Sequence, residues 1–186
     1  MSSDRTDPAD WTDGRWLPAE QRASPNFDPR PERASVDVVV LHHISLPAGQ
    51  FHGTAVVDFF ENQLDMARYP QLAELADIKV SAHFFVRRDG AVLQFVSCDD
   101  RAWHAGVSMW RGRSVCNDFS IGIEIEGDDK TPFSDKQYAA LNALLASIKN
   151  QYPIQGVTTH SEIAPGRKID PGPTFDWSRL DVHWHV

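Results

Sequence analysis

The chain has 186 residues, of which 41% are apolar and 24% charged, and its formal net charge is −8 at pH 7. This length and composition suit a soluble globular protein with one core, and the negative charge argues against a nucleic-acid partner. No apolar run reaches the roughly 18 residues that span a membrane, and the first residues lack the apolar centre of a secretory signal. The two cysteines, Cys98 and Cys116, form no disulfide framework and are expected to be small packing residues. We therefore expect a cytoplasmic protein with no obligate protein partner.

Residues 1–35 are polar and contain five prolines. We expect an irregular segment packed on the body of the protein, with Trp11, Trp16 and Phe27 as apolar anchors. Residues 36–186 are then expected to form a single domain.

The continuous apolar run Val38-Val39-Val40-Leu41 predicts a first buried strand over 36–41. It leads directly into His42 and His43, and Pro47 then stops the ladder. Successive side chains of a strand point to opposite faces, so at most one of the two histidines should face any given site. The register of the preceding apolar residues favours His42.

The next elements alternate between helices and strands. Apolar spacing predicts a helix over 54–64 and a short helical turn over 72–78. Two apolar runs around Asp89-Gly90, at 82–86 and 92–96, predict a β-hairpin.

The segment 119–126 alternates strictly, with Ile121, Ile123 and Ile125 on one face and Gly122, Glu124 and Glu126 on the other. Ser134 and Gln137 then match a capping box, followed by an apolar stripe, which predicts an amphipathic helix over 135–151.

A short strand over 154–159 and a short helix over 175–180 complete the expected elements. Interleaved strands and helices of this kind indicate an α/β (α+β) fold with a central mixed β-sheet flanked by helices.

The stretch 159–173 combines His160, Lys168 and Asp170 with several prolines and glycines. That composition favours a rigid, irregular loop, the kind of segment on which binding groups commonly sit. His42, His160 and Asp170 could supply three ligands to a hydrolytic zinc ion that keeps one position open for water. Eight histidines and 26 acidic residues allow many such triples, so this set is one possibility among several. A second, at His183 and His185, lies in a tail that we expect to be mobile.

Two neighbours favour the first set. Glu124 is a carboxylate on an otherwise apolar strand, where burial costs several kcal/mol unless the group is paired or functional. Lys168 precedes Asp170 by two residues, and solvation alone explains a lysine at that position poorly.

The chain resembles the AmpD-type N-acetylmuramyl-L-alanine amidases, within the wider group that includes peptidoglycan recognition proteins and phage T7 lysozyme. The matching pieces are VLHHISLP (40–47), VSAH (80–83), RRDG (87–90), RAWHAGVS (101–108), CNDFSIGIE (116–124) and HSEIAPGRKIDPGP (160–173). They occur in order over residues 36–178, which makes the match far more specific than three metal ligands alone.

The resemblance implies one Zn²⁺ ion held by His42, His160 and Asp170. It implies Glu124 as the carboxylate that takes a proton from water and passes it to the leaving amine. Lys168 is implied as the cation that stabilises the developing oxyanion.

The implied substrate is a cell-wall-derived anhydromuropeptide, cut between the lactyl group of 1,6-anhydro-N-acetylmuramic acid and L-alanine. The reaction belongs to peptidoglycan recycling, which in relatives affects β-lactamase induction. Trp103, His104 and His43 are candidate substrate contacts, although Trp103 and His104 could equally be structural, and His83 is expected to be structural. Two alternatives stay open: a module that binds the same ligand without cleaving it, and a regulatory partner protein.

Overall fold

The computed structural model describes residues 10–181, so that His183 and His185 lie outside the described residues. Its centre is a six-stranded sheet. The strands, in spatial order, are β12 (Gly156–Thr159), β5 (Val38–Ile44), β11 (Ser120–Glu126), β6 (Phe84–Val86), β7 (Val92–Gln94) and β3 (Glu20–Gln21). The first four are parallel, and β6 and β7 form the antiparallel hairpin predicted around Asp89-Gly90. The expected mixed sheet is thus confirmed.

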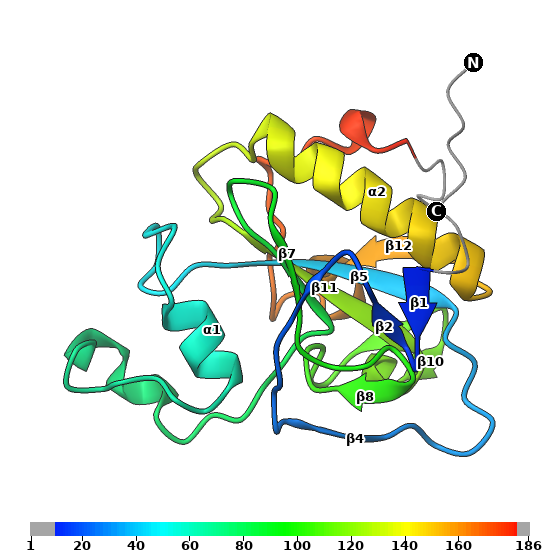
Figure 1. Cartoon of the computed structure of the whole chain (residues 1–186), viewed down its shortest axis with the longest axis horizontal. Helices are drawn as coiled ribbons and strands as arrows, with labels where there is room; N and C mark the ends of the chain where they lie inside the picture. Colours follow the sequence, from blue (N-terminus) through cyan, green and yellow to red (C-terminus); the bar gives the residue numbers. More distant parts are fainter. Residues whose placement is uncertain (1–9, 182–186) are drawn as a thin grey trace.

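The remaining elements are short, apart from one long helix (Figure 1). The α-helices are α1 (Ala55–Phe60), α2 (Asp135–Gln151) and α3 (His160–Ile163), the 3₁₀ helices are η2 (Pro70–Leu75), η3 (Cys116–Asp118) and η4 (Trp177–Arg179), and the peripheral strands are β1 (Trp11–Thr12), β2 (Arg15–Trp16), β4 (Phe27–Pro29), β8 (Asp100–Ala102), β9 (Met109–Trp110) and β10 (Arg113–Ser114). Among the described residues, none of the helices combines the length and apolarity needed to cross a bilayer.

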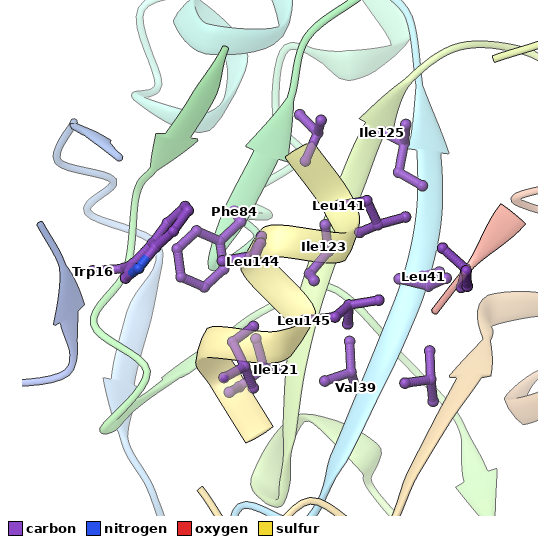
Figure 2. Packing of buried hydrophobic residues seen from close by; sticks show 14 of the residues in the cluster. Trp16, Val39, Leu41, Phe84, Ile121, Ile123, Ile125, Leu141, Leu144 and Leu145 are labelled. Carbon is purple, nitrogen blue, oxygen red and sulfur yellow. The ribbon is translucent and has the colours of Figure 1, made fainter. Parts of the chain in front are cut away.

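Helix α2 covers one face of the sheet (Figure 1). The predicted capping box is present, since the Ser134 hydroxyl accepts from the Gln137 amide and the Gln137 side chain accepts from the Ser134 amide. Figure 2 shows the apolar layer beneath this helix, where its leucines meet side chains from β5, β6 and β11. The labelled members are Trp16, Val39, Leu41, Phe84, Ile121, Ile123, Ile125, Leu141, Leu144 and Leu145.

The opposite face of the sheet is covered by smaller groups. One apolar cluster joins α1 to the β6–β7 hairpin and includes Phe60 and Phe85. Another joins Val38 and Val40 of β5 to Ile163 of α3. Alternation along β5 therefore puts His42 on this face, together with Val38 and Val40.

The three strands that carry the candidate residues end side by side. In the parallel register Glu124 of β11 pairs with His42 of β5, and Thr159 of β12 pairs with Leu41. His160 follows β12 directly. The carboxyl ends of adjacent parallel strands are where open α/β sheets commonly bind ligands, because the chain turns away and leaves a crevice there.

Several sequence expectations need correction. Helix α1 ends at Phe60 rather than Leu64. The start of the supposed irregular loop is a helical turn, α3, because Thr159 and Glu162 form a second capping box. In the N-terminal segment Trp16 is buried as expected. Phe27 is 43% exposed and is therefore not the apolar anchor that was predicted. That segment is also more regular than expected, since β3 adds to the edge of the central sheet.

Arg30, from the same N-terminal segment, connects this segment to the body of the protein through its side chain. Its guanidinium donates to four backbone carbonyls, those of Cys98, Asn117, Asp118 and Ser120, at 2.9–3.2 Å. This half-buried cation, satisfied by carbonyls rather than by a carboxylate, fixes the segment to the residues before β8, to η3 and to the start of β11.

Candidate metal centre

Three candidate ligands from distant parts of the chain converge at the carboxyl ends of β12 and β5. Nδ1 of His42 lies 2.9 Å from Nδ1 of His160, and these atoms lie 3.1 Å and 3.0 Å from Oδ2 of Asp170. All three residues are buried, at 1%, 5% and 8% exposure. The structure therefore brings together the set that the sequence analysis singled out.

This triangle fits a metal ion better than a hydrogen-bond network. A single hydrogen can lie between two of the three atoms but not among all three, whereas a cation can accept a lone pair from each. Atoms about 3 Å apart can all lie roughly 2 Å from one point, which is the distance that Zn²⁺ takes to imidazole nitrogen and carboxylate oxygen. Two imidazoles and one carboxylate are also a ligand set that leaves a position for water.

The charge states of His42 and Asp170 suit ligation. Burial lowers the pKa of His42 to about 4, although Asp170 opposes the shift, so that the ring is neutral at pH 7. Burial alone would raise the pKa of Asp170, but the adjacent His160 and His42 hold it below its usual range. A neutral imidazole and an ionised carboxylate are the forms that bind metals.

Glu124 lies beside this cluster and has no hydrogen-bond partner for Oε2, which is a buried atom. Burial raises the pKa of Glu124 well above its usual value, and the negative charge of Asp170 adds to the increase. Lys168 acts in the opposite direction. A carboxylate with a raised pKa is a stronger base than an ordinary one, which suits it to accept a proton from water.

A pocket of about 290 Å³ opens onto these groups. Glu124, His160, Lys168 and Asp170 line its polar side. Its apolar wall consists of Phe59, Phe60, Leu75, Ile78 and Val80, which come from α1, η2 and the segment that follows them. Because apolar residues in short helices look like ordinary core, this wall could not be predicted from the sequence.

The three candidate substrate contacts all border the pocket, but in different ways. Trp103 is half-buried and also lines a second cavity, beside Lys168. Of the two adjacent histidines only His43 is among the residues that line the pocket, whereas His42 belongs to the ligand cluster, so the two point to different surroundings as alternation predicted. Neither ring nitrogen of His43 has a hydrogen-bond partner in the protein.

His104 is buried at 8% exposure, and Nδ1 lies 2.9 Å from Nε2 of His42. It therefore contacts a candidate ligand directly, an arrangement that its sequence position did not indicate. Nε2 of His160 lies 3.1 Å from the carbonyl oxygen of Ala105, the residue that follows His104. His83, expected to be structural, is fully buried and accepts a hydrogen bond from the Gly122 amide.

Comparison with known proteins gives a consistent result. Residues 32–173 match the family model for N-acetylmuramoyl-L-alanine amidase. The 1,6-anhydro-N-acetylmuramyl-L-alanine amidase AmpD of Enterobacter cloacae is 50% identical over 168 residues, which cover 89% of this chain and 90% of that protein.

Solved structures agree with the sequence matches. A crystal structure of an AmpD selenomethionine derivative superposes with a TM-score of 0.87 at 45% identity, covering 91% of this chain and 96% of that one. The amidase AmiD of Escherichia coli, in complex with anhydro-N-acetylmuramic acid-L-Ala-D-γ-Glu-L-Lys, gives a TM-score of 0.59 at 32% identity, covering 81% of this chain and 59% of that one. With a family model that spans most of the fold and relatives of this similarity, the chain belongs to the N-acetylmuramoyl-L-alanine amidase family.

Proposed function

We propose that this protein is a zinc-dependent amidase of peptidoglycan recycling. It hydrolyses the amide bond between the lactyl group of 1,6-anhydro-N-acetylmuramic acid and L-alanine in soluble anhydromuropeptides. The observation that carries the proposal is the convergence of His42, His160 and Asp170 beside an unpaired, half-buried Glu124. The AmpD relatives, which match over nine tenths of their length, support the substrate class.

The residues divide the chemistry between them. His42, His160 and Asp170 would hold a zinc ion, which when bound would supply Lewis-acid polarisation of the scissile carbonyl and acidify water. Glu124 accepts the proton of the attacking water and delivers it to the leaving nitrogen of L-alanine. Its raised pKa supports this role, because the carboxylate is then a stronger base, which takes the proton of water more readily in the first step.

Lys168 borders both the main pocket and the neighbouring cavity, and its ammonium group balances the charge of Glu124. In this position it stabilises the negative charge that develops on the carbonyl oxygen during attack. The apolar wall and Trp103 offer contact area for the non-reacting parts of the substrate, such as a methyl group or the C–H face of a sugar.

A single assay tests the proposal against the alternative of a binding module. Zinc-loaded protein is incubated with anhydromuramyl tripeptide, and release of the free peptide is followed by mass spectrometry. We expect release that depends on zinc. Binding of the ligand without any release, at full zinc occupancy, would favour the binding module.

The proposal includes a cytoplasmic location, because the substrate is a soluble cell-wall fragment. Cell fractionation tests it, and recovery of the protein with the envelope would contradict it.

A further inference from the structure

We propose that His104 and Ala105 form a positioning segment that sets which ring nitrogen each histidine ligand presents to the metal. The inference rests on the proposed metal site and assigns a role to residues that touch the ligands but not the metal. A ligating histidine works only when the correct nitrogen carries the lone pair, so the partner of its other nitrogen decides its ligating capacity.

For His160 the assignment is direct. Nε2 faces the Ala105 carbonyl oxygen at 3.1 Å, and a carbonyl can only accept, so Nε2 carries the hydrogen. In the neutral ring Nδ1 then holds the lone pair, and Nδ1 is the atom that faces His42 and Asp170. The second acceptor position of the same carbonyl takes a hydrogen bond from Arg167 at 2.8 Å.

For His42 the assignment follows from a relay of three hydrogen bonds. The Ser120 hydroxyl donates to the Cys116 carbonyl at 2.6 Å, so its oxygen is free to accept from Nε2 of His104 at 3.1 Å. Nδ1 of His104 is then an acceptor, and Nε2 of His42 must donate to it at 2.9 Å. The relay starts at a backbone carbonyl and ends with the lone pair of His42 on Nδ1, directed at the metal site.

Strand β11 is built to admit this relay. A Cβ added at Gly122 would lie 2.4 Å from the His104 ring, which is far inside van der Waals contact. Ser120, Gly122 and Glu124 occupy successive positions on one face of the strand. Ser120 takes part in the relay, Gly122 makes room for the His104 ring, and Glu124 lines the pocket. This use explains the polar face that the alternating sequence showed.

The segment is itself fixed in place. The side-chain oxygen of Asn117 accepts from the backbone amides of His104 and Ala105, at 3.2 Å and 2.8 Å. The two histidine ligands, more than a hundred residues apart in sequence, thus depend on adjacent residues for their orientation.

The test replaces His104 by phenylalanine, which keeps a ring and removes both nitrogens. Zinc affinity is measured on the metal-free protein by competition with a chromogenic chelator. We expect His104→Phe to weaken zinc binding about 10- to 100-fold, the usual cost of losing an outer partner of a metal ligand. The ring nitrogens of His42 and His160 are followed by ¹⁵N NMR in the same metal-free samples.

In the unaltered protein both rings should carry hydrogen on Nε2. In His104→Phe, His42 should lose this preference while His160 keeps it, because the Ala105 carbonyl remains. His104→Asn, whose Oδ1 can take the place of Nδ1, should recover part of the affinity and serves as the second variant if the phenylalanine variant folds poorly.

His83→Phe is the control, because His83 is also buried, its ring packs edge-on against His104, and it has no nitrogen within hydrogen-bond distance of the three ligands. It should change stability but leave zinc affinity within about threefold. Zinc affinity in His104→Phe as high as in the control, with His42 still protonated on Nε2, would overturn the proposal. If the unaltered protein bound no zinc, the proposed function would fail, and the NMR result on metal-free protein would still decide the relay.

Discussion

The two faces of strands β5 and β11 show opposite ways of using the same backbone. On the face toward α2, Val39, Leu41, Ile121, Ile123 and Ile125 pack in one apolar layer (Figure 2), where contacts are numerous and non-directional. On the other face the residues between them include His42 and Ser120, which form specific hydrogen bonds, Gly122, which leaves room for the His104 ring, and Glu124, which lines the pocket.

The difference teaches that the alternation of side chains along a strand can place residues for stability on one face of the sheet and residues for function on the other. Apolar packing is roughly proportional to buried area, so one member of the layer can be exchanged at a graded cost. A proposed metal ligand, relay residue or catalytic carboxylate has no substitute nearby. Its loss should therefore change one property, such as zinc binding or turnover, and change the others little. Four predictions would break or sharpen this contrast.

The largest effect is expected from Asp170→Ala, which removes the only anionic ligand of the cluster. The variant should lose bound zinc and all measurable amidase activity, because two imidazoles leave the ion insufficiently held and its charge uncompensated. Metal analysis after dialysis checks this. Full zinc occupancy in the variant would show that a different set of residues holds the ion.

Glu124→Gln should keep zinc but lower kcat by about 10²- to 10⁴-fold, the usual contribution of a general acid–base group. The metal-free variant should also be more stable at pH 7–8. The raised pKa of Glu124 means that the folded protein disfavours the charged carboxylate. The free energy of unfolding should therefore decrease as the pH rises above the usual pKa of a glutamate, and the neutral glutamine avoids this loss. Thermal unfolding and zinc content are measured together. Retention of more than a tenth of kcat would remove Glu124 from the mechanism.

On the other face, Leu145→Ala should destabilise the protein by about 2–5 kcal/mol, because Leu145 is fully buried and the cavity cannot close completely. Zinc affinity measured below the unfolding transition should stay the same. Urea unfolding gives the first quantity and chelator competition the second. The control is Lys136→Ala on the exposed side of α2, where we expect a change within about 0.5 kcal/mol. A large fall in zinc affinity for Leu145→Ala would show that the two faces are coupled.

The smallest effect concerns pH. Burial holds the pKa of His83 well below 6.5, and nearby Arg30 lowers it further. Below pH 6.5 His83 is therefore protonated in the unfolded chain but not in the folded protein. As the pH falls, this residue should lower the free energy of unfolding by about 1.4 kcal/mol per pH unit. His83→Phe should reduce the slope by that amount between pH 6.5 and 5. Urea unfolding of metal-free protein at several pH values measures the slopes, and equal slopes would contradict the assignment.

Local patterns predicted most of the sheet and the long helix correctly. The alternation of 119–126, the Asp89-Gly90 turn and the capping box at Ser134 are local signals, and each produced the expected element. The convergence of His42, His160 and Asp170 was anticipated through motif resemblance, since nothing in their spacing alone selects them from many possible triples.

What the sequence did not indicate depends on contacts between distant residues. The second capping box turned the start of the 159–173 loop into α3, because Glu162 is three residues after Thr159 and can reach back to it. The role of His104 is visible only when its ring is seen between His42 and Ser120. The apolar wall from α1 and η2 could not be distinguished from core until the pocket was formed.

Arg30 has a practical consequence for shortening the gene. The family model begins to match at residue 32, so an expression clone trimmed to that boundary would omit this arginine. Four backbone carbonyls would then lose their donor, among them the Ser120 carbonyl, at the residue on which the His104 relay rests. A truncated enzyme that binds zinc poorly could therefore be mistaken for an inactive family member, when only its missing leading segment is at fault.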